Sequence, residues 1–398
     1  MSGTTAAARG SKAKILIALL TMSGVMATNG AIMPILNEIG ISFPEASTNA
    51  IQMAYSVSLL VSLPVMLASG VLTNRFSKKG LVLVGLLLMS VGGALPVVLH
   101  SSLVHVYIGS AFVGAGSGIV NILSSSLISD YYDGVDKARI MGYQSAALSA
   151  LGGVCTMASG MIATTWHWWF SFVLFLVGLP VFVLVMVLLP PDKPLGESAP
   201  KAGSVYKLGL IWWAILSFIW SVFMYAFNTN ISMFIDEQGF GGADVAGIVS
   251  SIFMIVGIPG GLILGPCIKV MKRHVVAIAC AVAASGMLVI GLAPNIGFVY
   301  VGAFLFGLGY AVRNPANVTF SAYLVPTAAS AAAIALVQAL GTVAGFLSPA
   351  VVNFISGLFD GSFRTTFLVC GVALGILSVL YFLFNPVSNE AIEGESAE

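Results

Sequence analysis

Two apolar segments joined by a short basic loop constrain the fold of this chain more than any other feature. Residues 50–72 and 81–99 contain no Asp, Glu, Lys or Arg, and each is long enough to cross a hydrocarbon core about 30 Å thick as a helix. The loop between them holds Arg75, Lys78 and Lys79 and no acid. Because Lys and Arg stay on the cytoplasmic side during insertion, this loop predicts a membrane-spanning hairpin and its orientation.

The composition of the whole chain agrees with a membrane protein. Of the 398 residues, 58% are hydrophobic and 8% are charged, whereas soluble domains are about 25% charged. Runs of this length cross a bilayer as helices, because lipid offers backbone groups no hydrogen-bond partner. The sequence therefore predicts an all-α polytopic membrane protein with twelve transmembrane helices and excludes a soluble enzyme. The twelve apolar runs are 14–37, 50–72, 81–99, 103–129, 139–163, 167–190, 207–234, 244–268, 274–294, 297–324, 330–356 and 364–385.

The charges are distributed unevenly over this topology. An even number of spans places both termini on one side, and 14 of the 16 Lys and Arg residues fall in segments that are then cytoplasmic. The exceptions are Arg313 and Arg364. We therefore expect both termini in the cytoplasm and an inner (cytoplasmic) or plasma membrane location. The predicted outer loops instead hold acids, namely Glu38, Glu45, Asp236, Glu237, Asp244 and Asp360.

The two halves of the chain resemble each other. Short motifs that begin at Gly114, Lys78 and Trp166 recur at Gly307, Arg273 and Phe363, with offsets of 193, 195 and 197 residues. A stretch rich in Pro, Gly and Ser separates six runs from six. Recurrence at a nearly constant offset predicts a duplicated architecture. The predicted organisation is an N-terminal six-helix half (1–190), a cytoplasmic linker (191–206), a C-terminal six-helix half (207–385) and a disordered acidic tail (386–398).

The basic loop resembles a signature of the major facilitator superfamily, Gly-x-Leu-x-Asp-Arg-x-Gly followed by two basic residues. Asn74 stands where the family has Asp, and Ser77 stands where it has Gly. The resemblance extends from about Lys14 to Asn385, and it implies two parallel halves that enclose a substrate site near the membrane midplane. The matching positions are Gly70, Leu72, Arg75, Lys78 and Lys79.

The resemblance also implies a gate at this loop. In relatives the loop Arg pairs with an acid at the cytoplasmic end of the fourth helix, and Asp130 stands there in this sequence. We expect Arg75, Asp130, Asn74, Lys78 and Lys79 to take part in gating, with a latch weakened by the missing charge at Asn74. The alternative is a solvated basic loop needed only for insertion.

Three marks of drug exporters in this family are absent. Ser110 stands where many exporters have Arg, and no acid lies between Lys14 and Asn37 in the first run. The fifth run carries Gly152-Gly153 without the usual Pro. The resemblance therefore points away from a proton-coupled drug exporter.

Arg313 is the most informative residue for function. It lies about ten residues, or roughly 15 Å, from the inner end of the run 297–324, too deep for its side chain to reach the interface. No Asp or Glu lies at comparable depth. We expect Arg313 to face a polar cavity and to bind the anionic group of a ligand, with Pro315 in an irregular, cavity-lining turn. The alternative is an Arg that caps carbonyls of a neighbouring broken helix.

Neutral polar side chains complete the predicted substrate site. Family architecture places the first, fourth, seventh and tenth helices around the cavity, which favours residues of these runs. For each Asn the alternative is a hydrogen bond between helices. No His, Cys or acid has the spacing of a metal site, and no cofactor is expected. Besides Arg313, the expected substrate-binding residues are Asn29, Asn121, Tyr225, Asn228, Asn314 and Asn317.

These features predict a secondary active transporter that moves a small organic or inorganic anion by alternating access. It would work as a monomer in the bilayer, as a symporter or exchanger coupled to protons or a counter-anion. The alternative in the same fold is a drug or metabolite exporter. A membrane sensor would carry a soluble signalling domain, and a membrane enzyme would need clustered His or acids, and neither is found. Nothing indicates a nucleic-acid partner.

Overall fold

The computed structural model describes residues 2–132, 134–190, 192, 208–326 and 329–387, which form helices and no strands. We call the helices before residue 191 the N-terminal half: α1 (Ser2–Val25), η1 (Met26–Ile35), α2 (Leu36–Ser42), α3 (Thr48–Leu72), α4 (Lys78–Val98), α5 (Leu103–Tyr131), α6 (Gly134–Thr165), η2 (Trp168–Val177) and α7 (Gly178–Leu188). The others form the C-terminal half: α8 (Leu208–Glu237), α9 (Ala243–Ile255), α10 (Gly257–Met271), η3 (Lys272–His274), α11 (Val275–Gly291), α12 (Ile296–Tyr323), α13 (Ser330–Gly357) and α14 (Phe363–Leu383).

The prediction of an all-helical membrane fold is confirmed. In the described part of the chain, eleven helical stretches are long and apolar enough to cross a membrane. The predicted run 244–268 instead forms two shorter helices, α9 and α10. The predicted linker lies outside the described residues except for Asp192, and the predicted tail does so except for Pro386 and Val387.

Short polar side chains define where several helices begin. Ser77, for example, accepts a hydrogen bond from the backbone N–H of Gly80 at the start of α4. Such a cap satisfies one of the N–H groups that a helix start leaves without an intrahelical partner. The other residues that cap a helix in this way are Ser47 for α3, Ser102 for α5, Asn295 for α12 and Ser362 for α14.

Close backbone contacts repeat between the two halves. A Cβ atom at Gly116 of α5 would overlap the carbonyl oxygen of Gly85 on α4. At an offset of 193 residues, a Cβ at Gly309 of α12 would overlap the carbonyl oxygen of Ala279 on α11. Small residues let helix backbones approach closely in lipid, so the two halves use the same packing device at equivalent positions. This recurrence supports the duplicated architecture.

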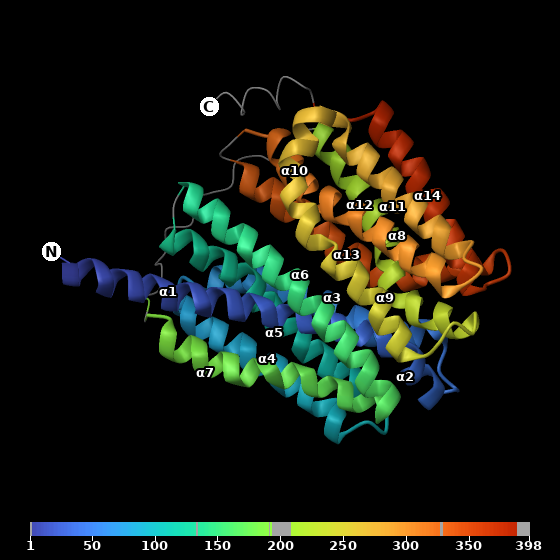
Figure 1. Ribbon diagram of the computed structural model, residues 1–398, viewed down its shortest axis with the longest axis horizontal. Helices are drawn as coiled ribbons and strands as arrows, with labels where there is room; N and C mark the ends of the chain where they lie inside the picture. The colour runs from blue at the N-terminus through green and yellow to red at the C-terminus, as the bar shows by residue number, and fades with distance from the viewer. Residues whose placement is uncertain (1, 133, 191, 193–207, 327–328, 388–398) are drawn as a thin grey trace.

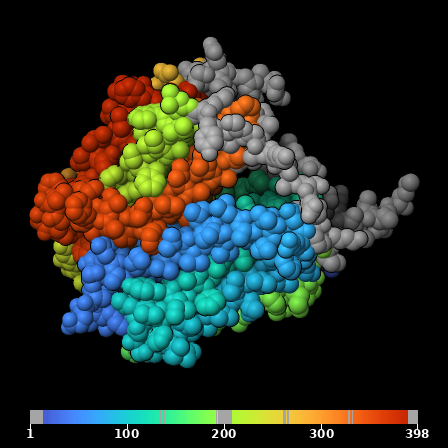
Figure 2. All heavy atoms as spheres, turned by 180° about the vertical axis from the view of Figure 1, so that it is seen from behind, coloured from blue at the N-terminus to red at the C-terminus, as the bar shows by residue number. Residues whose placement is uncertain are grey.

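The two halves lie side by side (Figure 1). Across their boundary α3 packs against α13, and α6 packs against α9 and α10. Figure 2 shows the first of these contacts from the opposite face, where α3 in light blue runs along α13 in orange-red. We call the end of the molecule that holds Arg75 and Lys78 the basic end, and the end that holds Glu45 and Asp360 the acidic end.

A cluster of side-chain amides joins the halves toward the acidic end. Gln52 of α3 donates to Asn230 Oδ1 of α8 at 2.7 Å and to the carbonyl of Thr229 at 3.2 Å. Asn353 of α13 donates to Gln52 Oε1 at 2.7 Å and to Asn49 Oδ1 at 2.6 Å. Gln52 and Asn230 are fully buried. We call Asn49, Gln52, Asn230 and Asn353 the amide cluster.

The tenth predicted run differs from expectation at Pro315. α12 is one continuous helix from Ile296 to Tyr323, so the irregular turn expected at Pro315 is not formed. A proline removes one ladder hydrogen bond, and packed neighbouring helices tolerate this loss in a membrane helix. Arg313 is therefore presented from a regular helix.

Candidate functional site

Arg313 lies deep inside the C-terminal half with 2% of its surface exposed. Its Nη2 donates to the hydroxyl of Tyr381 on α14 at 2.9 Å and to Ser217 Oγ on α8 at 3.3 Å. The guanidinium carbon lies 4.7 Å from the centre of the Trp220 ring. A desolvated cation over an indole face is stabilised by about 2 kcal/mol. These neutral partners position the guanidinium and leave its charge intact.

Among the residues that the structure describes, the cation has no carboxylate partner. Within the described residues no Asp or Glu lies within ion-pair distance of Arg313, and its Nε is buried without a hydrogen-bond partner. A buried charge is strongly destabilising unless a partner compensates for desolvation. The alternative role at carbonyls of a broken helix does not hold here, because the bonded partners are side-chain hydroxyls. The site is therefore suited to an external anion.

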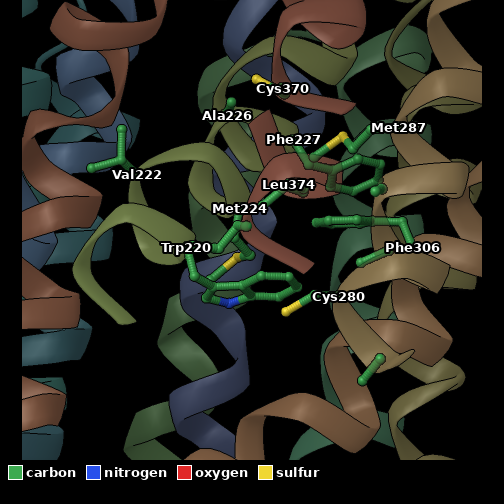
Figure 3. Packing of buried hydrophobic residues seen from close by; sticks show 14 of the residues in the cluster. Trp220, Val222, Met224, Ala226, Phe227, Cys280, Met287, Phe306, Cys370 and Leu374 are labelled. Carbon is green, nitrogen blue, oxygen red and sulfur yellow. The ribbon is translucent and has the colours of Figure 1, made fainter. Parts of the chain in front are cut away.

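Two further hydrogen bonds hold the side chains beside Arg313. Ser217 Oγ donates to Asn317 Oδ1 at 2.7 Å, and Trp213 Nε1 donates to Ser321 Oγ at 3.1 Å. Figure 3 shows Trp220 and Met224 projecting from α8, with Cys280 of α11 close to the indole ring. The shell of Arg313 thus combines residues from α8, α11, α12 and α14.

A cavity of about 120 Å³ opens beside Arg313. It is bounded by α8, α12 and α13, and its wall contains hydroxyl and amide groups but no acid. Of the expected substrate-binding residues, Tyr225, Arg313, Asn314 and Asn317 line it. The complete lining is Trp220, Ser221, Met224, Tyr225, Tyr310, Arg313, Asn314, Asn317, Val337, Gln338, Gly341 and Thr342.

The other three expected residues lie outside this lining. Asn29 accepts a hydrogen bond from Ser58 Oγ at 3.2 Å, which is the interhelical bond weighed as its alternative. Asn121 is exposed on α5. Asn228 is buried and donates to the hydroxyl of Tyr55 on α3 at 3.2 Å. The structure therefore gathers four of the five C-terminal members of the expected set and leaves Asn228 and the two N-terminal members outside the lining.

Sequence reasoning missed several groups around Arg313, above all Trp220, Tyr310 and Tyr381. One signal was present on α8, where Ser217, Ser221 and Asn228 recur at spacings of four and seven residues. Such residues share one helix face. No comparable pattern marks Tyr381, because its approach to Arg313 depends on the packing of α14.

The predicted gate residues are partly brought together. Lys78 Nζ lies 2.5 Å from Asp130 Oδ2 and forms an ion pair with it. The backbone N–H groups of Lys78 and Lys79 donate to the carboxylate of Asp192 at 2.6 and 3.1 Å. Arg75 is exposed. In this conformation the partner of Asp130 is therefore Lys78, which lies three residues after the expected Arg75.

A larger groove of about 480 Å³ lies elsewhere, between α8, α13 and α14. Its wall is almost entirely apolar, and residues such as Phe359, Val372 and Ile376 are more than half exposed. Apolar side chains exposed on a membrane helix face lipid. This groove offers no group for solute recognition, and the Arg313 cavity remains the candidate site.

Comparison with known proteins gives the same architecture. A family model described as Major Facilitator Superfamily matches residues 15–284 and 242–398. The chain is 23% identical over 432 aligned residues to the quinolone resistance protein NorB of Staphylococcus aureus (strain COL), covering 90% of this chain and 92% of the relative.

Solved structures of transporters share the fold. The nucleoside transporter NupG superposes with a TM-score of 0.76 and 12% identity, covering 92% of this chain and 99% of that one. A D-xylose-proton symporter gives a TM-score of 0.76 and 14% identity, with coverage of 95% and 98%. A bacterial homologue of the human lysosomal transporter Spinster, in an inward-facing and unoccupied conformation, gives 0.73 and 14%, with coverage of 94% and 96%.

Proposed function

The chain belongs to the major facilitator superfamily and is a membrane transporter, and from its site we propose that it carries a small anionic solute bound at Arg313. The observation that supports this most strongly is a buried guanidinium with neutral partners, an unpartnered Nε and a place in the wall of a polar cavity. In a low-dielectric site a carboxylate or oxyanion is the natural counter-charge for such a group.

The size of the cavity argues for a small solute. About 120 Å³ is below the range of roughly 300–1,000 Å³ that holds drug-sized ligands. The lining offers amide and hydroxyl donors, among them Asn314, Gln338 and Thr342. Such groups fix the orientation of a polar solute and add no repulsive negative charge.

Coupling follows from the same chemistry in this proposal. Since no acid of the described residues stands beside Arg313, a proton would travel on the solute itself, or a counter-anion would return in exchange. The working unit is a monomer with both termini in the cytoplasm, an orientation supported by the charge asymmetry of the loops.

We also propose that the structure is closed at the acidic end and that Arg75, Asp130, Asn74, Lys78 and Lys79 gate the basic end. The amide cluster supports closure at the acidic end. The ion pair of Lys78 with Asp130 shows that a basic loop residue can reach the α5 acid. Arg75 would become the partner of Asp130 when the basic end closes.

A drug exporter is the second candidate. The named resemblance to quinolone resistance protein NorB favours it. Quinolones are carboxylic acids on a fused aromatic ring system, so Arg313 could also bind their charged group. A molecule of that size would have to extend well beyond the described cavity.

An uptake screen with purified protein in liposomes separates the two. The panel contains small carboxylates, cyanate, nitrate, a quinolone and neutral and cationic drugs. We expect saturable uptake of at least one small anion and none of the cations. Uptake restricted to drugs would instead establish the exporter, and uptake of a cation would reject the anion site.

A further inference from the structure

Outside the lining of the Arg313 cavity, Asn228 has a buried polar atom without a hydrogen-bond partner among the described residues. It is 4% exposed, and its Oδ1 is buried without a partner among the described residues. Asn228 lies seven residues after Ser221 on α8, and a seven-residue spacing places both on one helix face. Ser221 lines the Arg313 cavity. The unpartnered oxygen therefore continues the same face of α8.

Tyr55 brings the N-terminal half to this point. It lies on α3 with 5% of its surface exposed, and its hydroxyl oxygen accepts a hydrogen bond from Asn228 Nδ2 at 3.2 Å. Within the described residues no acceptor takes the hydroxyl proton of Tyr55. The Asn228–Tyr55 pair thus presents one free acceptor and one free donor next to each other.

Two cavity residues connect this pair to Arg313. The hydroxyls of Tyr225 and Tyr310 lie near that of Tyr55, and both tyrosines line the Arg313 cavity. Phenol groups therefore lie near both sites. These tolerate both the apolar and the polar parts of a bound molecule.

We propose that the Asn228–Tyr55 pair is a second, neutral subsite, which binds a hydroxyl group of the same solute whose anionic end lies against Arg313. The inference rests on the proposed function. A hydroxyl both donates and accepts, so it satisfies Asn228 Oδ1 and the Tyr55 proton together. A carboxylate cannot donate and an ammonium group cannot accept. The substrate class is thus a hydroxylated carboxylic acid.

The spacing of the two subsites sets the length of the solute. Asn228 follows Trp220, the residue beneath the guanidinium, by eight residues, which is about 12 Å along the helix. Two hydrogen bonds of about 2.8 Å leave roughly 6 Å between the anionic and hydroxyl oxygens. A flexible acid of four to six carbons with a terminal hydroxyl spans this distance, and it contacts both halves at once.

The test measures binding of hexanoate and 6-hydroxyhexanoate to the purified protein by calorimetry. The variants are Asn228→Leu and Tyr55→Phe. Tyr107→Phe is the matched control, because Tyr107 donates to the Ala50 carbonyl within the N-terminal half. We expect wild type and Tyr107→Phe to bind 6-hydroxyhexanoate about tenfold more tightly than hexanoate. Tyr55→Phe reduces this ratio, and Asn228→Leu brings it close to one.

The outcomes separate the subsite from the proposed function. Equal affinities for the two acids in wild type, or a preference that survives in both variants, would overturn the subsite. Arg313→Gln should abolish binding of both acids. If neither acid binds wild type, or both bind Arg313→Gln as well as wild type, the proposed anion site fails and the subsite fails with it. If Asn228→Leu does not fold, Tyr55→Phe alone decides.

Discussion

Arg313 is positioned by groups that cannot neutralise it. Tyr381 and Ser217 accept its N–H groups, and the Trp220 ring covers one face of the guanidinium. This arrangement leaves Nε buried without a partner. A guanidinium held in this way has little freedom to reorient. Its attraction to an incoming anion would offset the free-energy cost of its desolvation.

Tyr381→Phe tests the positioning role. The ring stays and the hydroxyl is lost, so Arg313 Nη2 loses its shorter hydrogen bond. We expect a loss of about 1–2 kcal/mol in stability and weaker anion binding through misplacement of the guanidinium. Thermal unfolding and calorimetric titration measure the two effects. Unchanged anion affinity together with reduced stability would restrict Tyr381 to a packing role.

Asp360 gives a pH-dependent prediction outside the membrane spans. Hydrogen bonds from Thr365 and from Ser362 lower the pKa of its carboxyl below the ordinary 3.8. A carboxyl whose pKa is lower in the folded state stabilises above its unfolded pKa and loses this contribution as pH falls through the folded pKa. Asp360→Asn should therefore lower the melting temperature slightly at pH 7, and the difference from wild type should disappear as the pH falls through the lowered pKa of the folded state. A difference independent of pH would contradict the assignment.

At this scale the sequence predicted that Arg313 faces a polar cavity but few of its neighbours. The depth of Arg313 follows from its position along one helix, and the absence of an acid at that depth follows from the composition of the apolar runs. The approach of Tyr381 and Tyr55 depends on the rotation and tilt of α14 and α3, which a single sequence does not encode locally. Asn29 shows the same limit, since its partner Ser58 lies on another helix.

Among the elements, α3, α8 and α13 are joined by the amide cluster. Gln52→Leu would leave Asn230 Oδ1 without its donor and would remove one of the two acceptors of Asn353 Nδ2, at a cost of roughly 2 kcal/mol to the closed acidic end. We expect the population to shift toward opening at that end. Spin labels placed on α3 and α13 at the acidic end would report a longer distance between the two helices in the variant.

Ser356→Ala is the matched control for this change. Ser356 is buried on α13 and donates to the carbonyl of Asn353 in the same helix, so it makes no bond between the halves. Its distance distribution should equal that of wild type. Equal distributions in Gln52→Leu and wild type would remove the amide cluster from the closure mechanism.

Two variants in the loop between α3 and α4 distinguish a role in stability from a role in gating. Lys78→Gln breaks the observed ion pair with Asp130, and it should lower stability by no more than about 1 kcal/mol because Asp130 is 45% exposed. Arg75→Gln should leave that stability unchanged and reduce transport, if Arg75 pairs with Asp130 when the basic end closes. Liposome uptake and thermal unfolding measure the two quantities. Full transport by Arg75→Gln would remove Arg75 from the gate and leave Lys78 as the basic partner of Asp130.

Element boundaries show where local chemistry was informative. Long apolar runs predicted the helices, and serine caps at Ser47 and Ser77 mark their starts. The break between α9 and α10 comes just before Pro259. This proline is the third residue of α10, where a helix start tolerates a missing N–H. Pro315 has the same chemistry within α12 and produces no break. The presence of a proline in an apolar run therefore does not by itself predict a break.

Over the whole molecule, the internal repeat was the most reliable guide to architecture. Recurrent glycines predicted from offsets near 193 occupy equivalent close contacts, such as Gly116 against Gly85 and Gly309 against Ala279. The candidate site breaks this symmetry. Arg313 lies in the C-terminal half, and the position that corresponds to it at this offset is Val120. The neighbouring Asn121 is exposed. The polar groups that surround Arg313 therefore come from one half.

The central claim is that Arg313 binds the negative charge of the transported solute, and the most direct measurement is anion affinity in its variants. Calorimetry on purified protein would use the anion that shows the highest uptake. Arg313→Lys keeps the charge and loses the planar fork, so it should weaken binding about tenfold, and Arg313→Gln should abolish it. Arg364→Gln is the control, because Arg364 also has neutral partners, Gln238 and the Ala293 carbonyl, outside the cavity. Unchanged affinity in Arg313→Gln would contradict the account.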